Sequence, residues 1–137
     1  GDNGVTACIA ISAPASDTDD FRRSFEEFRT PCLHITGVHD VSPIKGTRAE
    51  DRRLPFDAIK SGDQYLVIFR DADHMVFTGR VWPGRDPSID VEIHRLMKAC
   101  TTLFLDAYLR GDSVAKEWLQ GEGMRSLLGA EASVEKK

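Results

Sequence analysis

Three short apolar runs constrain the fold of this chain more than any other feature. They occupy residues 5–11, 32–36 and 64–69, are rich in Val, Ile and Leu, and show little alternation of polar and apolar residues. A strand with one face in water alternates, whereas a strand covered on both faces reads as a continuous apolar run. The runs therefore predict three strands of a parallel sheet that is covered on both faces.

Helical patterns separate and follow these runs. A stripe of three phenylalanines predicts a short helix within residues 17–30, which Pro31 ends. A second short helix is expected over residues 54–60, and the strongest apolar periodicity predicts a long helix over residues 89–109, with a last helix over residues 112–118. Strands that alternate with helices predict right-handed crossovers, and hence an α/β fold with helices on both faces of the sheet.

The predicted sheet is thin for a whole domain. Three strands leave two bare edges, whose unpaired backbone groups are a liability, so the chain reads like part of a larger sheet. We expect residues 1–129 to form the C-terminal part of one domain and residues 130–137 to be a polar, frayed tail. The first residues lack an initiator methionine and lead into a strand almost at once, as expected after removal of an N-terminal segment.

Composition argues against several classes of protein. Of 137 residues, 41% are hydrophobic and 29% are charged, as in a globular domain, and no apolar run reaches the roughly 20 residues of a membrane span. The net charge is −4 and the basic residues are scattered, so nucleic acid is not an expected partner. The densest basic cluster, Arg48, Arg52 and Arg53, is interleaved with acidic residues and indicates a solvated face. Three cysteines without metal-ligand spacing are expected to be buried thiols: Cys8, Cys32 and Cys100.

Two polar residues follow predicted strands at the point where each strand ends. Asp40 comes after the turn Gly37-Val38-His39, and His74 comes after the third strand. In open parallel sheets, ligands bind at the carboxyl ends of the strands. A carboxylate there can hold a histidine in one tautomer, and a histidine can move a proton near neutral pH. Each residue alone also fits an ordinary turn, but together they predict the acid and the base of a catalytic triad.

The nucleophile of such a triad is missing from the sequence. A nucleophile elbow needs small residues around Ser or Cys, and neither G-x-S-x-G nor G-x-C-x-G occurs. Ser12 follows the first strand without glycine neighbours, and Ser42 fits a turn, so neither is expected to be the nucleophile. A metal site built from His34, His39 and His74 is the weaker alternative, because no helix carries an H-x-x-x-H pair to support it.

Several of these segments together resemble a known family. They are residues 9–14 (IAISAP), residues 31–40 (PCLHITGVHD) and residues 71–74 (DADH), the last followed by a long helix. In this order and spacing they resemble the C-terminal half of an α/β-hydrolase, and are most similar to dienelactone-hydrolase-like esterases, lipases and platelet-activating-factor acetylhydrolases. The resemblance covers residues 5 to about 120.

This resemblance implies roles for individual residues. The three strands would be the sixth, seventh and eighth of the fold, with Asp40 as the triad acid and His74 as the general base. The missing part would hold the first five strands, the nucleophile elbow and most of the oxyanion hole. The substrate pocket would be lined by His39, Met75, Val76, Phe77 and Trp82. Families of this kind use no metal or organic cofactor.

The expected function is therefore that of the C-terminal part of a serine hydrolase acting on carboxylic esters, inactive without the half that bears the nucleophile. Its partners would be a small-molecule ester and the N-terminal half of the same fold, or a second copy of the chain. The alternative is a non-catalytic binding or assembly domain that pairs through an exposed sheet edge. Nothing in the sequence indicates a compartment.

Overall fold

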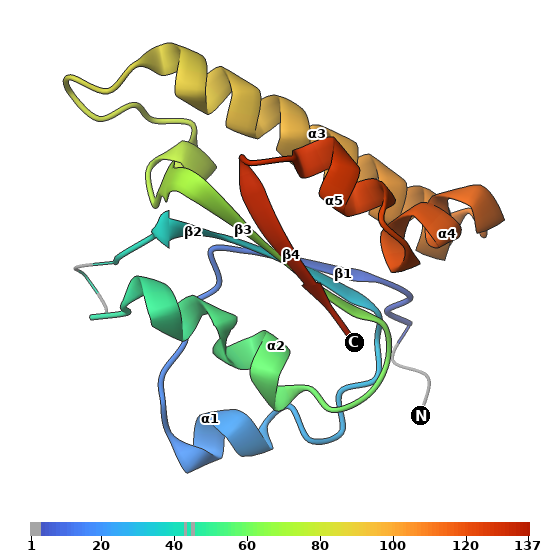
Figure 1. Cartoon of the computed structure of the whole chain (residues 1–137). Helices are drawn as coiled ribbons and strands as arrows, with labels where there is room; N and C mark the ends of the chain where they lie inside the picture. Colours follow the sequence, from blue (N-terminus) through green and yellow to red (C-terminus); the bar gives the residue numbers. More distant parts are fainter. Residues whose placement is uncertain (1–3, 43, 45) are drawn as a thin grey trace.

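The fold is a mixed four-stranded sheet between two layers of helices (Figure 1). The computed structural model describes residues 4–42, 44 and 46–137, so the expectation for residues 1–3 lies outside the described residues. The strands lie in chain order across the sheet: β1 (Cys8–Ile11), β2 (Cys32–His39), β3 (Gln64–Asp73) and β4 (Ala132–Lys136). The predicted α/β class is confirmed.

The first three strands are parallel, as their apolar runs predict, and the fourth is not. Cys8 lies opposite Cys32 and Cys32 lies opposite Gln64 in the parallel part of the sheet, whereas β4 runs antiparallel to β3. The predicted purely parallel three-stranded sheet is therefore wrong in strand number and direction.

The polar, frayed tail predicted for residues 130–137 is also wrong, because these residues contain β4. Their strand pattern is short and mostly polar, so periodicity alone does not reveal it. Ala132 and Val134 nevertheless pack against the core, and the backbones of Gln64 and Lys137 exchange two hydrogen bonds of 2.9 and 3.0 Å. Backbone pairing and this small apolar contact fix the end of the chain on the edge of β3, which leaves β1 and β4 as the outer strands of the described sheet.

Helices cover the two faces of the sheet separately (Figure 1). One face carries α1 (Asp19–Arg23), the 3-10 helix η1 (Ala49–Arg53) and α2 (Leu54–Ala58). The other face carries α3 (Pro87–Leu109), α4 (Ser113–Gln120) and α5 (Gly123–Leu128), and the short 3-10 turn η2 (Val76–Thr78) joins β3 to this layer. Among the described residues, none of the helices combines the length and the apolar character that crossing a bilayer requires.

The main core lies between the sheet and α3. Fully buried side chains of β2 and β3 meet one apolar face of that helix: Leu33, Ile35, Tyr65, Val67, Phe69, Ile93, Leu96, Cys100 and Phe104. Asp86 caps the helix by accepting a hydrogen bond from the backbone of Ser88, and Pro87 occupies its first turn. This packing fixes β2 and β3 against α3, and the polar residues of the candidate site follow the carboxyl ends of these two strands.

Candidate active site

The carboxyl ends of the three parallel strands bring three polar side chains together. Ser12 directly follows β1, Asp40 directly follows β2, and His74 directly follows β3. The Nδ1 atom of His74 lies 2.9 Å from Oδ1 of Asp40. The hydroxyl of Ser12 lies 2.8 Å from the same Nδ1 and 2.9 Å from the same Oδ1. The two residues predicted as acid and base are thus within hydrogen-bond distance, and the structure adds a serine to them.

An irregularity between β2 and β3 sets this alignment. Gly37 lies opposite Phe69, yet His39 lies opposite Asp73, so β3 contains two more residues than β2 over this stretch. An unshifted register would place residue 40 opposite residue 72, whereas the observed shift brings Asp40 level with His74. A Cβ atom on Gly37 would lie 2.2 Å from the backbone oxygen of Ala72, so glycine is required where the two strands meet.

Asp40 is fully buried and its carboxylate is held on both oxygens. Thr36 donates its hydroxyl hydrogen to Oδ2 at 2.9 Å, while Ser12 donates to Oδ1. An Nη atom of Arg52 lies 3.5 Å from Oδ1, and the Nε–H of the same residue donates to the backbone oxygen of Asp40 at 3.2 Å. A buried carboxylate is stable only when it is paired and hydrogen-bonded in this way. The acid is therefore fixed in both position and orientation.

Arg52 corrects one expectation from the sequence, because it is buried and not part of a solvated face. It lies on η1, is 4% exposed, and donates hydrogen bonds of 2.9 Å to the backbone oxygens of Ser12 and Ala13. It thereby joins the segments that follow β1 and β2. Its neighbour Arg53 turns outward, so a one-residue step along η1 separates a buried cation from a surface one. No signal in the sequence distinguishes the two.

The turn that carries His74 is anchored at its base. The carboxylate of Asp73 accepts a hydrogen bond of 3.0 Å from the backbone N–H of Val76. The backbone oxygen of Val76 lies 2.7 Å from Nε2 of His94, which projects from α3. The His74 side chain itself remains 36% exposed. This arrangement leaves one side of the imidazole open while its Nδ1 side faces the buried acid.

The contact of Ser12 with His74 does not have the geometry of a nucleophile. In a working triad, Nδ1–H is donated to the acid and Nε2 takes the proton of the nucleophile. Ser12 instead contacts Nδ1, the atom that also faces Asp40. When Nδ1 carries the proton, both it and the Ser12 hydroxyl donate to Asp40. Across the described residues, no hydrogen bond engages Nε2 of His74.

Ser12 is held in place by an uncommon backbone conformation. Its φ angle is +50°, in the left-handed region that non-glycine residues seldom occupy. Its backbone N–H donates to the oxygen of Ile35 at 2.8 Å, and its backbone oxygen accepts from Arg52. These contacts direct the hydroxyl toward Asp40. We interpret Ser12 as a residue that orients the acid and the histidine.

A hollow of about 230 Å³ opens beside the site. Its walls come from the segments after β1 and β2 and from the imidazole: Ser12, Pro14, Ser42, Ile44, Thr47, Arg52 and His74. None of the residues predicted to line the substrate pocket is among them. His39 is exposed, Met75 is half-buried, Phe77 packs against the core and Trp82 is 57% exposed. Their roles stay predictions, and the apolar residues that do line the hollow, Pro14 and the exposed Ile44, were not predicted from the sequence.

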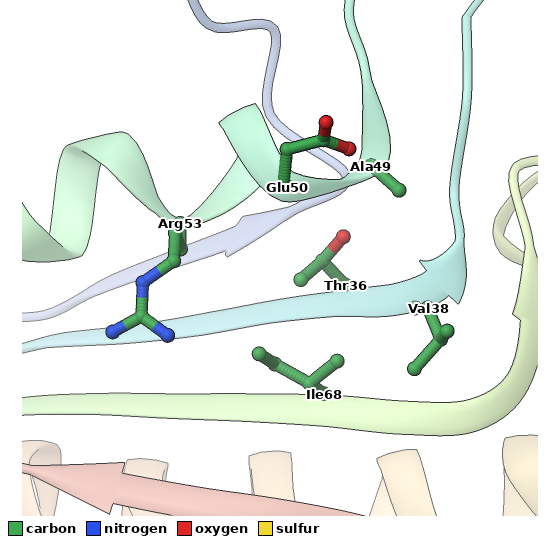
Figure 2. A pocket seen from close by; sticks show the side chains of 7 residues that line it. Thr36, Val38, Ala49, Glu50, Arg53 and Ile68 are labelled. Atoms are coloured by element: carbon green, nitrogen blue, oxygen red, sulfur yellow. The ribbon is translucent and has the colours of Figure 1, made fainter.

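A second hollow, of about 290 Å³, lies between the sheet and η1 (Figure 2). Thr36, Val38 and Ile68 form its floor on β2 and β3, and residues of η1 form the opposite wall. Among the latter, Arg53 is held by Asp57 and Glu135 at its edge. Thr36 lines this hollow and also donates a hydrogen bond to Asp40, whereas His74 is not among the lining residues.

The metal alternative gains no support from the arrangement of histidines. His34 is buried on β2, where its Nε2 lies 3.0 Å from Oε1 of Gln64, and burial lowers the pKa of its imidazole. His39 and His74 do not converge on it. Within residues 4–42, 44 and 46–137, no group of three or more His, Cys, Asp or Glu side chains is arranged to hold a metal ion.

Comparison of the chain with protein-family models and with curated proteins finds no match.

Proposed function

We propose that this chain is the C-terminal part of a serine hydrolase of the α/β-hydrolase kind that acts on carboxylic esters. The observation that carries the proposal is the contact of 2.9 Å between His74 Nδ1 and the fully buried carboxylate of Asp40. The order of strand, acid, strand and histidine along the chain supports it, because it matches the order in which that family presents these two residues. The nucleophile would come from a segment outside this sequence.

In the proposed reaction, a serine from the other part of the fold would lie at Nε2 of His74. His74 would take the hydroxyl proton as the serine attacks the ester carbonyl, and would return it to the leaving alcohol. Asp40 would accept the Nδ1–H bond throughout and stabilise the imidazolium, held in place by Thr36, Ser12 and Arg52. Backbone N–H groups of the other part would stabilise the oxyanion, each contributing about 3 kcal/mol.

The decisive experiment compares the 137-residue chain with the gene product that contains it. The chain alone should neither react with a fluorophosphonate probe nor hydrolyse an aryl ester. The longer product should do both, and Asp40→Asn should lower its turnover by about 10⁴-fold. Asp57→Asn is the matched control, because Asp57 makes an ion pair with Arg53 on the surface, and should leave turnover unchanged. Covalent labelling of the chain alone, abolished by Ser12→Ala, would overturn the proposal.

A non-catalytic assembly domain remains the second candidate, and the outer edge of β1 favours it. In the described part of the chain β1 pairs only with β2, and the exposed side chains of Val5 and Ile11 flank that edge. The other outer strand, β4, carries Glu135 and Lys136, charges that discourage pairing with another sheet. This candidate requires a defined oligomer in size-exclusion chromatography, and no effect of Asp40→Asn or His74→Gln on it.

A further inference from the structure

Two cysteines lie directly opposite one another at the start of the parallel sheet. Cys8 on β1 is the register partner of Cys32 on β2. Register partners on neighbouring strands project from the same face, and neighbouring strands are about 4.7–4.9 Å apart. The Cα atoms in disulfides are roughly 4.4–6.8 Å apart. The two backbones therefore already stand at a separation that a disulfide can span.

The surroundings of the pair give the two thiols different roles. Cys32 is 1% exposed, whereas Cys8 is partly exposed on the outer strand. Burial raises the pKa of the Cys32 thiol, and the adjacent Cys8 thiol, which is hydrogen-bonded to it, raises it further. A thiol that is buried and hard to ionise reacts slowly with a solute, so Cys8 is the thiol that an oxidant meets first.

We propose that Cys8 and Cys32 form a reversible disulfide in response to a low-molecular-weight disulfide such as glutathione disulfide. The Cys8 thiolate attacks one sulfur of the oxidant, which forms a mixed disulfide and releases one thiolate of glutathione. Cys32 then loses its proton, attacks the sulfur of Cys8 and releases the second glutathione thiolate. The two protein thiols lose two protons and two electrons, and the oxidant is reduced to two thiols. Because β1 is a four-residue outer strand, it can make the small shift that bonding distance requires.

Cys8 and Cys32 lie at the opposite ends of the strands from Asp40 and His74, so their oxidation is independent of the proposed hydrolase function. A disulfide would covalently link the outer strand β1 to β2. Since Ser12 directly follows β1 and its hydroxyl contacts Asp40, this link would also restrict the movement of the segment that carries Ser12. Such a bond between adjacent strands would be reduced again by glutathione or dithiothreitol, as exposed or strained disulfides are.

The test uses the purified chain, native and reduced, incubated with glutathione disulfide at neutral pH. The expected product is monomeric and lighter by the mass of two hydrogen atoms, with one of its three thiols still free. Trypsin cuts after Arg22, Arg29 and Lys45, so Cys8 and Cys32 fall on residues 1–22 and 30–45. These two peptides should appear joined, and dithiothreitol should separate them. Recovery of both as free, alkylated peptides would overturn the proposal.

Single substitutions identify which cysteines form the disulfide. Cys32→Ser should stop the reaction at a stable glutathione adduct on Cys8. Cys100→Ala is the matched control and should leave the Cys8–Cys32 link unchanged, because Cys100 is fully buried on the core-facing side of α3 and burial raises its pKa to about 12. Two outcomes with the unsubstituted, folded chain would contradict the proposed pairing. One is a disulfide between Cys100 and either of the other two cysteines. The other is a glutathione adduct on Cys8 that does not react further.

Discussion

Replacing Arg52 with Met should reveal how much the buried cation contributes to the site. Met keeps most of the length of the side chain and removes the guanidinium. The change leaves the fully buried carboxylate of Asp40 without its cation and removes the donors to the backbone oxygens of Ser12, Ala13 and Asp40. Removing one partner of a buried ion pair costs about 3–5 kcal/mol. Because whole domains are stable by about 5–15 kcal/mol, a large fraction of the stability should be lost.

Urea unfolding at neutral pH, followed by circular dichroism, measures this loss. Arg53→Met is the matched control, since Arg53 is the next residue on η1 and makes half-exposed pairs with Asp57 and Glu135. The control should lose at most about 1 kcal/mol. The double variant Arg52→Met/Asp40→Asn should lose less than the sum of its single variants, by about 1–3 kcal/mol. If Arg52→Met loses no more than Arg53→Met, the inferred role of the buried cation is wrong.

Three further outcomes follow from the packing. Gly37→Ala should destabilise the fold by about 1–3 kcal/mol in urea unfolding, because its Cβ would lie 2.2 Å from the oxygen of Ala72. A loss of less than about 0.5 kcal/mol, as is usual for surface substitutions, would contradict this. Burial lowers the pKa of His34 in the folded state below its unfolded value of 6.5, so the folded state resists protonation of this side chain. The free energy of unfolding should therefore be at its full value above the unfolded-state pKa and should fall as the pH drops below it. His34→Gln should remove this decrease in the free energy of unfolding between pH 7.5 and 5.5. Val134→Asp should detach β4 and raise hydrogen exchange in β3, and unchanged protection would show that β4 does not cover that strand.

The sequence predicted the elements whose signals are local. The three apolar runs are the three parallel strands, and the long helix expected over residues 89–109 is observed as α3 (Pro87–Leu109). Both signals are carried by residues that neighbour one another along the chain. The strand β4 was missed, since its pairing with β3 joins segments more than sixty residues apart and leaves little apolar pattern in residues 132–136.

The candidate site likewise combines residues that have a local sequence signal with residues whose placement depends on distant segments. Asp40 and His74 could be recognised because each follows a strand, and their proximity follows from parallel topology. Their roles in catalysis stay predictions. Arg52 was misread as solvated because its sequence neighbours are charged, whereas its burial depends on how η1 packs against β2. The prediction that Ser12 is not an elbow serine stays a prediction, and nothing in the sequence indicates its contact with the acid.

By itself, the sequence indicated the three parallel strands β1, β2 and β3 and the polar residues that follow β2 and β3, but not the antiparallel strand β4. Only the tertiary structure decided the register, and with it the contact of 2.9 Å between Asp40 and His74. It also decided that Ser12 joins them and that Cys8 faces Cys32. The physical reason is that strand propensity depends on near neighbours, whereas register depends on close packing between distant segments, such as Gly37 against Ala72.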